Sequence, residues 1–253
     1  MIDLHSHLLP GVDDGSRSVA QSIGVLRELA SQGLTDICLT PHLTASLAET
    51  GVPSAHDVAF SALATEAPPE VRLHRGAEVM LDRPLGPAAA ANRGITLGGS
   101  RYLLVEFPRI VPAGTVAVAL RQVVACGLVP LLAHPERYNS CSVAAAQAWQ
   151  QAGAVLQVDA NTLLSPSARG ERARQLLAAG LAGVLAADNH GDRRSLAAVR
   201  DALVEQDGAG RAELLLVENP RAILEDRSVT AVEPFALRRS FVHRLRRLLE
   251  GES

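Results

Sequence analysis

Short apolar runs alternate along the chain with longer stretches in which apolar residues recur at helical spacing. The short runs are typical of buried β-strands. Seven of them occur, at residues 1–7, 35–42, 71–79, 101–108, 128–137, 154–161 and 182–190. The helical spacing predicts helices at residues 18–33, 115–127, 166–180 and 193–208, and each stretch ends at a glycine, which commonly terminates a helix.

The alternation of strands and helices predicts an α/β fold with parallel strands joined by right-handed crossovers. Seven such units are enough to close a seven-stranded β/α barrel. The first strand is not followed by a GxGxxG motif, which argues against a dinucleotide-binding fold. No linker rich in proline, glycine or serine divides the chain, so we expect residues 1–253 to form a single domain.

Residues 234–250 predict a basic amphipathic helix at the C-terminus. Its apolar residues fall on one face, and arginines crowd the other. Such a helix can contact an anionic membrane or a partner. More commonly, such a helix packs against its own domain or against a second copy of the chain. A homo-oligomer is therefore one of the expected possibilities.

Composition excludes several classes of function. The net charge of -3 gives no basic field for nucleic acid. No apolar stretch reaches the roughly eighteen residues of a membrane span, and no signal-peptide pattern is found, so we expect a cytoplasmic protein. All 24 basic residues are arginine, which excludes mechanisms that need a phosphate-loop or Schiff-base lysine. None of the three cysteines has an arginine six residues later, which excludes a Cys-x5-Arg phosphatase loop.

Residues able to bind a metal ion follow six of the seven predicted strands. Because the carboxyl ends of barrel strands meet on one face, these scattered side chains would converge there. The sixth run is the exception, because it ends in Asp159 and Asn161, which we expect only to support the ligands. The candidate ligands are His5, His7, Asp14, His42, Glu78, Glu106, His134, Asp188 and His190.

The set as a whole predicts a metal centre, although a lone histidine at a strand end is more often a hydrogen-bonded core residue. Glu106 lies within an apolar run, and an unpaired buried carboxylate requires a cation or a proton. His5 and His7 point to the same side of a strand, because side chains alternate. The other three histidines lie in loop, mid-strand or helical contexts and are expected to be structural: His56, His74 and His243.

Counting charges favours more than one ion. Two divalent ions would only balance the four candidate carboxylates, whereas a third would leave positive charge that attracts a phosphate monoester. Nine side chains also suit three ions better than one, because each ion keeps positions for water and substrate. Mixed histidine and carboxylate ligands suit manganese, iron or zinc, and this donor set does not distinguish among the three metals.

Several segments resemble the polymerase-and-histidinol-phosphatase (PHP) superfamily: "MIDLHSHLLPGVDDGS", "GAE", "RYLLVEF", "AHPERY" and "ADNH". They look most like its bacterial manganese-dependent protein-tyrosine phosphatases of capsule and exopolysaccharide synthesis. The resemblance extends from Met1 to about residue 224. It implies a distorted seven-stranded β/α barrel of the PHP type, and it carries all nine candidates over as metal ligands.

The resemblance also implies an activity and a partner. The chain would be a metal-dependent phosphomonoester hydrolase that uses three manganese ions and dephosphorylates a protein, namely a bacterial tyrosine autokinase. Arg137 matches a family arginine that binds the substrate phosphate. A second such arginine follows the final Asp-x-His, where Arg193 and Arg194 are both candidates. Arg137, His42 and Asp14 are the expected catalytic residues.

Three alternatives stay open. Another PHP phosphoesterase, acting on histidinol phosphate or a nucleotide, would have the same metal ligands and would differ in the residues that surround the substrate. A TatD-like nuclease also begins with His-x-His, but "DDG" and "AHPERY" do not favour it, and the acidic chain lacks a basic track for DNA. A non-catalytic metal-binding module of polysaccharide assembly would hold metal tightly without turnover.

Overall fold

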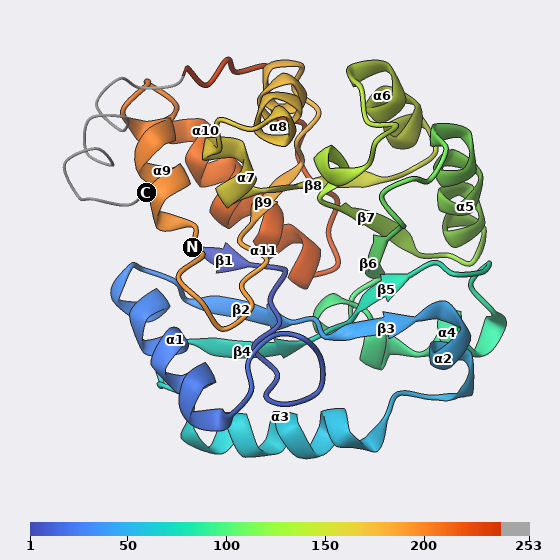
Figure 1. The fold of residues 1–253 in the computed structure, drawn as a ribbon, viewed down its shortest axis with the longest axis vertical. Coiled ribbons are helices and arrows are strands. Elements are labelled where there is room, and N and C mark those ends of the chain that lie inside the picture. Colours follow the sequence, from blue (N-terminus) through green and yellow to red (C-terminus); the bar gives the residue numbers. More distant parts are fainter. Residues whose placement is uncertain (239–253) are drawn as a thin grey trace.

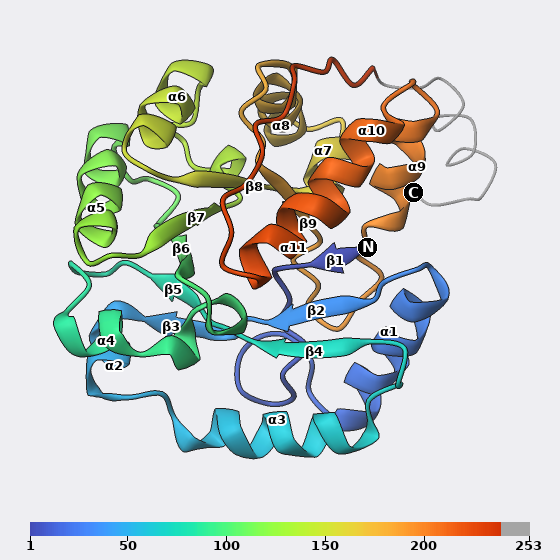
Figure 2. The ribbon, with the colours of Figure 1, turned by 180° about the vertical axis from the view of Figure 1, so that it is seen from behind.

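Two parallel sheets form the centre of the molecule in a computed structural model that describes residues 1–238 (Figures 1 and 2). One sheet has three strands in the order β1-β2-β4, and the other has six in the order β3-β5-β6-β7-β8-β9. Every strand pair within them is parallel. The strands are β1 (Ile2–Asp3), β2 (Asp36–Leu39), β3 (His42–Thr44), β4 (Arg72–Arg75), β5 (Glu78–Met80), β6 (Tyr102–Glu106), β7 (Val129–Ala133), β8 (Val155–Asp159) and β9 (Val184–Ala186).

All seven predicted strand segments contain strands, but two of them are broken into two pieces. Residues 35–42 form β2 and β3, which are separated by Thr40 and Pro41. Residues 71–79 form β4 and β5, which are separated by Gly76 and Ala77. Proline cannot donate to a ladder and glycine weakens a strand, so these positions favour the breaks. The first pieces therefore pair in one sheet, and the second pieces pair in the other.

A closed seven-stranded barrel is not confirmed, because the strands of the described residues divide into these two sheets. Beyond the short strand β1, a single parallel bridge joins Ser6 to Asn189. The amide of His7 donates to the carbonyl of Asn189 at 2.7 Å, and that of Asp188 donates to the carbonyl of His5 at 3.1 Å. These contacts place the first histidine-bearing segment beside the segment that follows β9.

The helices lie outside the sheets and connect the strands (Figure 1). The four predicted helical stretches correspond to α1, α5, α8 and α9, whereas α3 and α6 were not among them. The helices are α1 (Val19–Ser31), α2 (Ala45–Thr50), α3 (Ser54–Glu66), α4 (Pro87–Ala91), α5 (Ala113–Ala125), α6 (Val143–Gln151), α7 (Ala160–Leu164), α8 (Ala168–Ala178), α9 (Ala197–Val204), α10 (Ala209–Glu213) and α11 (Asn219–Leu224). Short 3-10 turns are η1 (Arg93–Ile95), η2 (Leu97–Gly99) and η3 (Pro135–Arg137), and η4 (Leu214–Glu218) is a π-helical turn.

The core lies between the sheets and their covering helices. Ile23, Leu26 and Leu29 on α1 are buried at helical spacing, which explains why this stretch was recognisable in the sequence. Ser18 caps the same helix by accepting a hydrogen bond from the amide of Gln21. The largest fully buried side chains include Trp149 on α6. The scaffold that holds the strand ends is therefore densely apolar.

The predicted C-terminal helix falls mostly outside the described residues. Residues 227–238 carry no regular secondary structure, so positions 234–238 of that prediction are not helical. The remaining positions, 239–250, lie beyond the described part of the chain and stay a prediction. Among the helices of residues 1–238, none combines the length and apolar character that a membrane crossing requires.

Candidate metal centre

The structure brings all nine predicted ligands together beside the ends of the strands, where β2 and β4 give way to β3 and β5 and where β6, β7 and β9 end. His5 and His7 follow β1, His42 begins β3, Glu78 begins β5 and Glu106 ends β6. The residues fall into four overlapping groups in which one ligand atom of each residue lies within 4.8 Å of the others. These groups are His7–Asp14–His42–His190, His5–Glu78–His134, His5–His7–Asp188 and His42–Glu78–Glu106.

Four ligand atoms face one another at the buried centre of the cluster. Nε2 of His5 lies 3.2 Å from Nε2 of His7. Oε2 of Glu78 lies 3.2 Å and 3.3 Å from these two nitrogens, respectively. Oδ1 of Asp188 lies 3.3 Å and 3.2 Å from the same two atoms. All four side chains are at most 1% exposed, so water does not screen their charges.

The hydrogen bonds behind the two imidazoles show that this centre fits a cation. Nδ1 of His5 faces Oε1 of Gln157 at 3.0 Å, and Nδ1 of His7 faces Oδ2 of Asp13 at 2.7 Å. An amide or carboxylate oxygen only accepts, so Nδ1 of each ring carries a proton, and in the neutral imidazole Nε2 presents a lone pair. Four electron-rich atoms then converge, which is costly unless a positive charge lies among them.

The carboxylates give the same indication. Oε2 of Glu78 and Oδ1 of Asp188 are buried, and neither makes a hydrogen bond within residues 1–238. Burial opposes protonation of His7, but the hydrogen bond to Asp13 and the nearby carboxylates of Asp188 and Glu78 outweigh it and raise the pKa of His7 well above its ordinary value. Without a metal ion, protons therefore supply the positive charge that this site requires, and a bound ion would displace them.

Glu78 joins the buried part of the cluster to its outer part. Its Oε1 lies 2.8 Å from Nε2 of His134, and its Oε2 lies 3.1 Å from Nδ1 of His42. Burial opposes ionisation of Glu78, but the neighbouring histidines outweigh it and hold the pKa of this carboxyl well below its ordinary value. Nδ1 of His42 also lies 3.3 Å from Oε1 of Glu106. A single ionised carboxylate can thus serve two adjacent ions.

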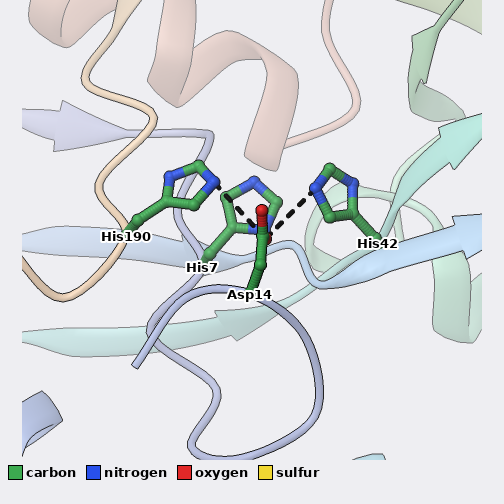
Figure 3. Close-up of side chains that lie close together, drawn as sticks. All are labelled: His7, Asp14, His42 and His190. Atoms are coloured by element: carbon green, nitrogen blue, oxygen red, sulfur yellow. Dashed lines mark ion pairs between the residues drawn. The ribbon is translucent and has the colours of Figure 1, made fainter. Parts of the chain in front are cut away.

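The outer part of the cluster consists of Asp14, His42 and His190, which lie beside His7 (Figure 3). Oδ1 of Asp14 lies 3.4 Å from Nε2 of His42 and 3.5 Å from Nε2 of His190. The rings of His190 and His7 stack with their centroids 4.2 Å apart. The side chain of Asp14 is 68% exposed and that of His42 is 40% exposed. A substrate therefore reaches the cluster from the side of these two residues.

Two of the ligand-bearing residues have strained backbones. His134 has φ 32° and Asp188 has φ 51°, both in the left-handed region that residues other than glycine avoid. Such conformations cost on the order of 1–3 kcal/mol and persist where the surroundings fix them, often at functional sites. His134 directly follows β7 and precedes η3, so this turn aims the imidazole at Glu78.

Of the predicted substrate arginines, two border the cluster. Arg137 forms ion pairs with Asp159, at 2.5 Å, and with Asp188. Nη1 of Arg194 lies 3.5 Å from Oδ2 of Asp188. Arg193 is exposed, and within the described residues it forms no ion pair. The geometry thus favours Arg194 over Arg193 as the second arginine at this site.

Asp159 and Asn161 lie beside the cluster in supporting positions. Asp159 pairs with Arg137 and caps α7 by accepting hydrogen bonds from the amides of Asn161 and Thr162. Nδ2 of Asn161 donates to the carbonyl of Ala187, next to Asp188. Both residues thus hold the segments that carry the ligands and the arginine.

Two hydrogen-bond partners of the candidate ligands were not predicted from the sequence. Two of the histidines expected to be structural do lie outside the cluster. Asp13, beside Asp14, and Gln157, in β8, each orient an imidazole, and only the doubled aspartate in "DDG" could have suggested the first. His74 pairs with Asp36 at 2.9 Å. His56 on α3 makes no hydrogen bond through its side chain within residues 1–238. His243 lies outside the described residues.

A parallel α/β fold with imidazoles and carboxylates gathered at its strand ends defines a protein able to hold a cluster of metal ions. The chain belongs to the family described as "Capsular polysaccharide synthesis, CpsB/CapC", whose model matches residues 1–225. This family assignment confirms the resemblance to the phosphatases of capsule synthesis.

Named relatives and a solved structure agree with this assignment. The tyrosine-protein phosphatase CpsB of Streptococcus pneumoniae is 28% identical over 243 residues, covering 90% of this chain and 100% of that protein. The tyrosine-protein phosphatase YwqE of Bacillus subtilis is 24% identical over 247 residues, covering 94% of this chain and 97% of that protein. A crystal structure from work on YwqE and CpsB, described as "unique metal-dependent tyrosine phosphatases", superposes with a TM-score of 0.77 at 25% identity, covering 94% of this chain and all of its own.

Proposed function

We propose that this chain is a metal-dependent phosphatase that hydrolyses phosphotyrosine in a protein. The observation that supports it most is the cluster of nine ligand side chains, whose outer face opens to solvent beside two arginines. The names of its relatives point to the same activity. The family's role in capsular polysaccharide synthesis favours a bacterial tyrosine autokinase as the protein substrate.

The nine residues would hold up to three divalent ions, which we propose to be manganese. His5, His7, Glu78 and Asp188 would hold the innermost one, and the overlapping groups would hold the others. The bound ions would supply Lewis acidity and acidify water at neutral pH. Carboxylate and imidazole ligands together suit manganese, although iron and zinc accept the same donors.

The residues around the cluster would bind and orient the phosphate ester. Arg137 is held in place by Asp159, and its planar guanidinium matches phosphoryl oxygens. Arg194 hydrogen-bonds the carbonyl of Asp188 and would contact a second oxygen. Asp14 and His42 lie at the open face, and we expect them to act in catalysis there, where a histidine could supply a proton to the leaving group. A phenolate needs little protonation, so weak acid catalysis suffices for phosphotyrosine.

Two other functions remain as outcomes of the test. A PHP phosphoesterase for small substrates would share these ligands, and a metal-binding module without activity would share the metal. The nine candidate ligands do not distinguish these two functions from a tyrosine phosphatase, because the three differ in the residues that surround the substrate. The relatives' names favour the phosphatase of proteins.

The experiment compares turnover of four substrates by the manganese-loaded protein: a phosphotyrosyl peptide, histidinol phosphate, a nucleoside monophosphate and single-stranded DNA. We expect the phosphotyrosyl peptide to be hydrolysed with the highest kcat/KM, and a chelator to abolish this activity. A preference for histidinol phosphate or a nucleotide would contradict the proposal. So would tight metal binding without turnover of any substrate.

A further inference from the structure

Three arginines form a cluster of positive charge on the surface beside Arg137. They are Arg109 in the loop after β6, and Arg169 and Arg172 in the first turns of α8. We call these three residues the outer arginine cluster. The whole chain is acidic, with a net charge of -3, so positive charge gathered here is a local feature.

Backbone contacts fix this cluster against the segment that carries Arg137. Nε of Arg172 donates to the carbonyl of Glu136 at 2.9 Å. The carbonyl of Arg109 accepts a hydrogen bond from the amide of Asn139 at 2.7 Å. Both flanking elements therefore contact residues one or two positions from Arg137, which itself pairs with Asp188 in the candidate metal centre.

Within residues 1–238, ion pairs do not neutralise the charges of this cluster. Burial, followed by the charges of Arg109, Arg137 and Arg172, lowers the pKa of Arg169. None of the three cluster arginines forms an ion pair with a described residue, whereas Arg174 on the same helix pairs with Glu171 at 2.9 Å. Like charges held together repel one another, and an anion bound from outside would relieve that repulsion.

The loop that carries Arg109 is accessible to solvent. Pro108, Arg109 and Ile110 are exposed, and the side chain of Ile110 is 81% exposed. This loop follows Glu106, the last residue of β6 and a candidate ligand. A peptide that places a phosphotyrosine in the centre would therefore pass its neighbouring residues over this loop and α8.

We propose that the outer arginine cluster binds acidic side chains that flank the phosphotyrosine of the protein substrate, and this inference rests on the proposed function. Guanidinium groups bind carboxylates with two parallel hydrogen bonds, which makes acidic residues the matching partners. No aromatic residue is among the exposed large apolar side chains of the described chain. A binding surface for single-stranded nucleic acid usually offers such stacking platforms, so an acidic peptide fits better.

The test uses two phosphotyrosyl peptides that differ only in their flanks, one with aspartate and glutamate and one with asparagine and glutamine. The variant Arg109→Gln/Arg169→Gln removes two cluster charges, while Arg172 stays because it supports η3. The matched control is Arg27→Gln/Arg121→Gln, which changes exposed arginines on α1 and α5 by the same total charge. In both views α1 lies far from α8 (Figures 1 and 2).

We expect the cluster variant to lower kcat/KM for the acidic peptide about five- to tenfold, as two partly exposed ion pairs allow. It should leave the neutral peptide and p-nitrophenyl phosphate unchanged, and it should flatten the salt dependence measured with the acidic peptide. The control variant should behave like the wild-type protein. An equal loss with both peptides, or no loss with the acidic one, would overturn the inference.

A binding measurement keeps this inference separate from the proposed function. Fluorescence anisotropy of a labelled, unphosphorylated acidic peptide reports on the cluster even if no phosphotyrosine is hydrolysed. We expect the cluster variant to bind this peptide several-fold more weakly than the wild-type and control proteins at low salt. Equal binding by all three proteins would contradict the inference, whereas a failure of hydrolysis alone would contradict only the proposed function.

Discussion

Asp13 accepts a hydrogen bond from Nδ1 of His7 at 2.7 Å, and the same carboxylate oxygen accepts one from the amide of His42 at 3.2 Å. One side chain that is not itself a candidate ligand therefore orients two segments that carry ligands. Its other oxygen accepts from the amide of Gly15 at 3.0 Å, which fixes the loop that carries Asp14.

Replacing Asp13 should weaken metal binding without unfolding the protein. We expect Asp13→Asn to lower metal affinity and kcat/KM by about tenfold, and Asp13→Ala by up to about 100-fold, because losses of this size follow when the partner of a metal-bound imidazole is removed. Calorimetric titration with manganese and steady-state kinetics measure the two effects. Asp201→Asn, an exposed change on α9, is the control. Unchanged affinity in Asp13→Ala would contradict this role.

Removing Asp14 should abolish activity at little cost in stability. Its side chain is 68% exposed and contacts only His42 and His190 among the ion pairs of the described residues. We expect Asp14→Ala to lower kcat by about 100-fold or more, while the melting temperature of the metal-free protein changes by at most about 2 °C. Circular dichroism and phosphatase assays on the same samples measure both. Full activity in this variant would show that Asp14 is not part of the site.

Arg137, Arg194 and Arg193 should differ in their effects. Arg137→Lys keeps a charge but loses the planar fork, so we expect kcat/KM to fall by about tenfold or more. Arg194→Gln should also lower kcat/KM, because Arg194 lies against Asp188 and His190. Arg193→Gln should change it less than about twofold, since an exposed charge away from the substrate contributes little. Steady-state kinetics with a phosphotyrosyl peptide measures all three. A larger effect of Arg193 than of Arg194 would reverse the assignment.

His56 should make the protein less stable in mild acid. Its side chain lines a small pocket together with Leu9, Phe60 and Arg75, and burial lowers the pKa of His56 below the ordinary value. The unfolded chain then binds a proton that the folded chain resists, so stability falls as the pH drops through about 6.5. His56→Gln should weaken this dependence.

Thermal unfolding of the metal-free protein between pH 8 and pH 5 measures the effect of His56. The comparison is with His74→Gln, because His74 pairs with Asp36 at 2.9 Å, whereas His56 has no such partner among the described residues. Candidate ligands titrate alike in every sample, so the difference between variants isolates the contribution of His56. An identical pH dependence in wild-type protein and His56→Gln would contradict the expectation.

The sequence predicts that the nine candidate ligands lie together, because their positions follow from one rule, that parallel strands end at the same edge. His134 and Glu106 each follow a short apolar run. If these runs are neighbouring parallel strands, the two side chains are predicted to meet at one edge of the sheet. The rule does not predict where a strand bends. Pro41 and Gly76 divide two predicted strands, and the sheets separate there. Proline and glycine mark positions where a break is favoured, but they do not show that the two pieces join different sheets.

The partners of the ligands were not predictable from the pattern. Gln157 faces His5 across 152 positions of sequence, and no spacing rule links a glutamine in one strand to an imidazole after another. The choice between Arg193 and Arg194 also depended on three-dimensional contacts, because neighbours in sequence point in different directions. Such contacts arise from packing, which only the folded chain defines.

Anomalous diffraction from crystals grown with manganese tests the central claim most directly. The account predicts anomalous peaks within the cluster, with one peak among Nε2 of His5, Nε2 of His7, Oε2 of Glu78 and Oδ1 of Asp188, the four atoms that lie 3.2–3.3 Å from their neighbours. Elemental analysis of the same protein should give two to three ions per chain. An empty cluster, or manganese bound only elsewhere on the molecule, would contradict it.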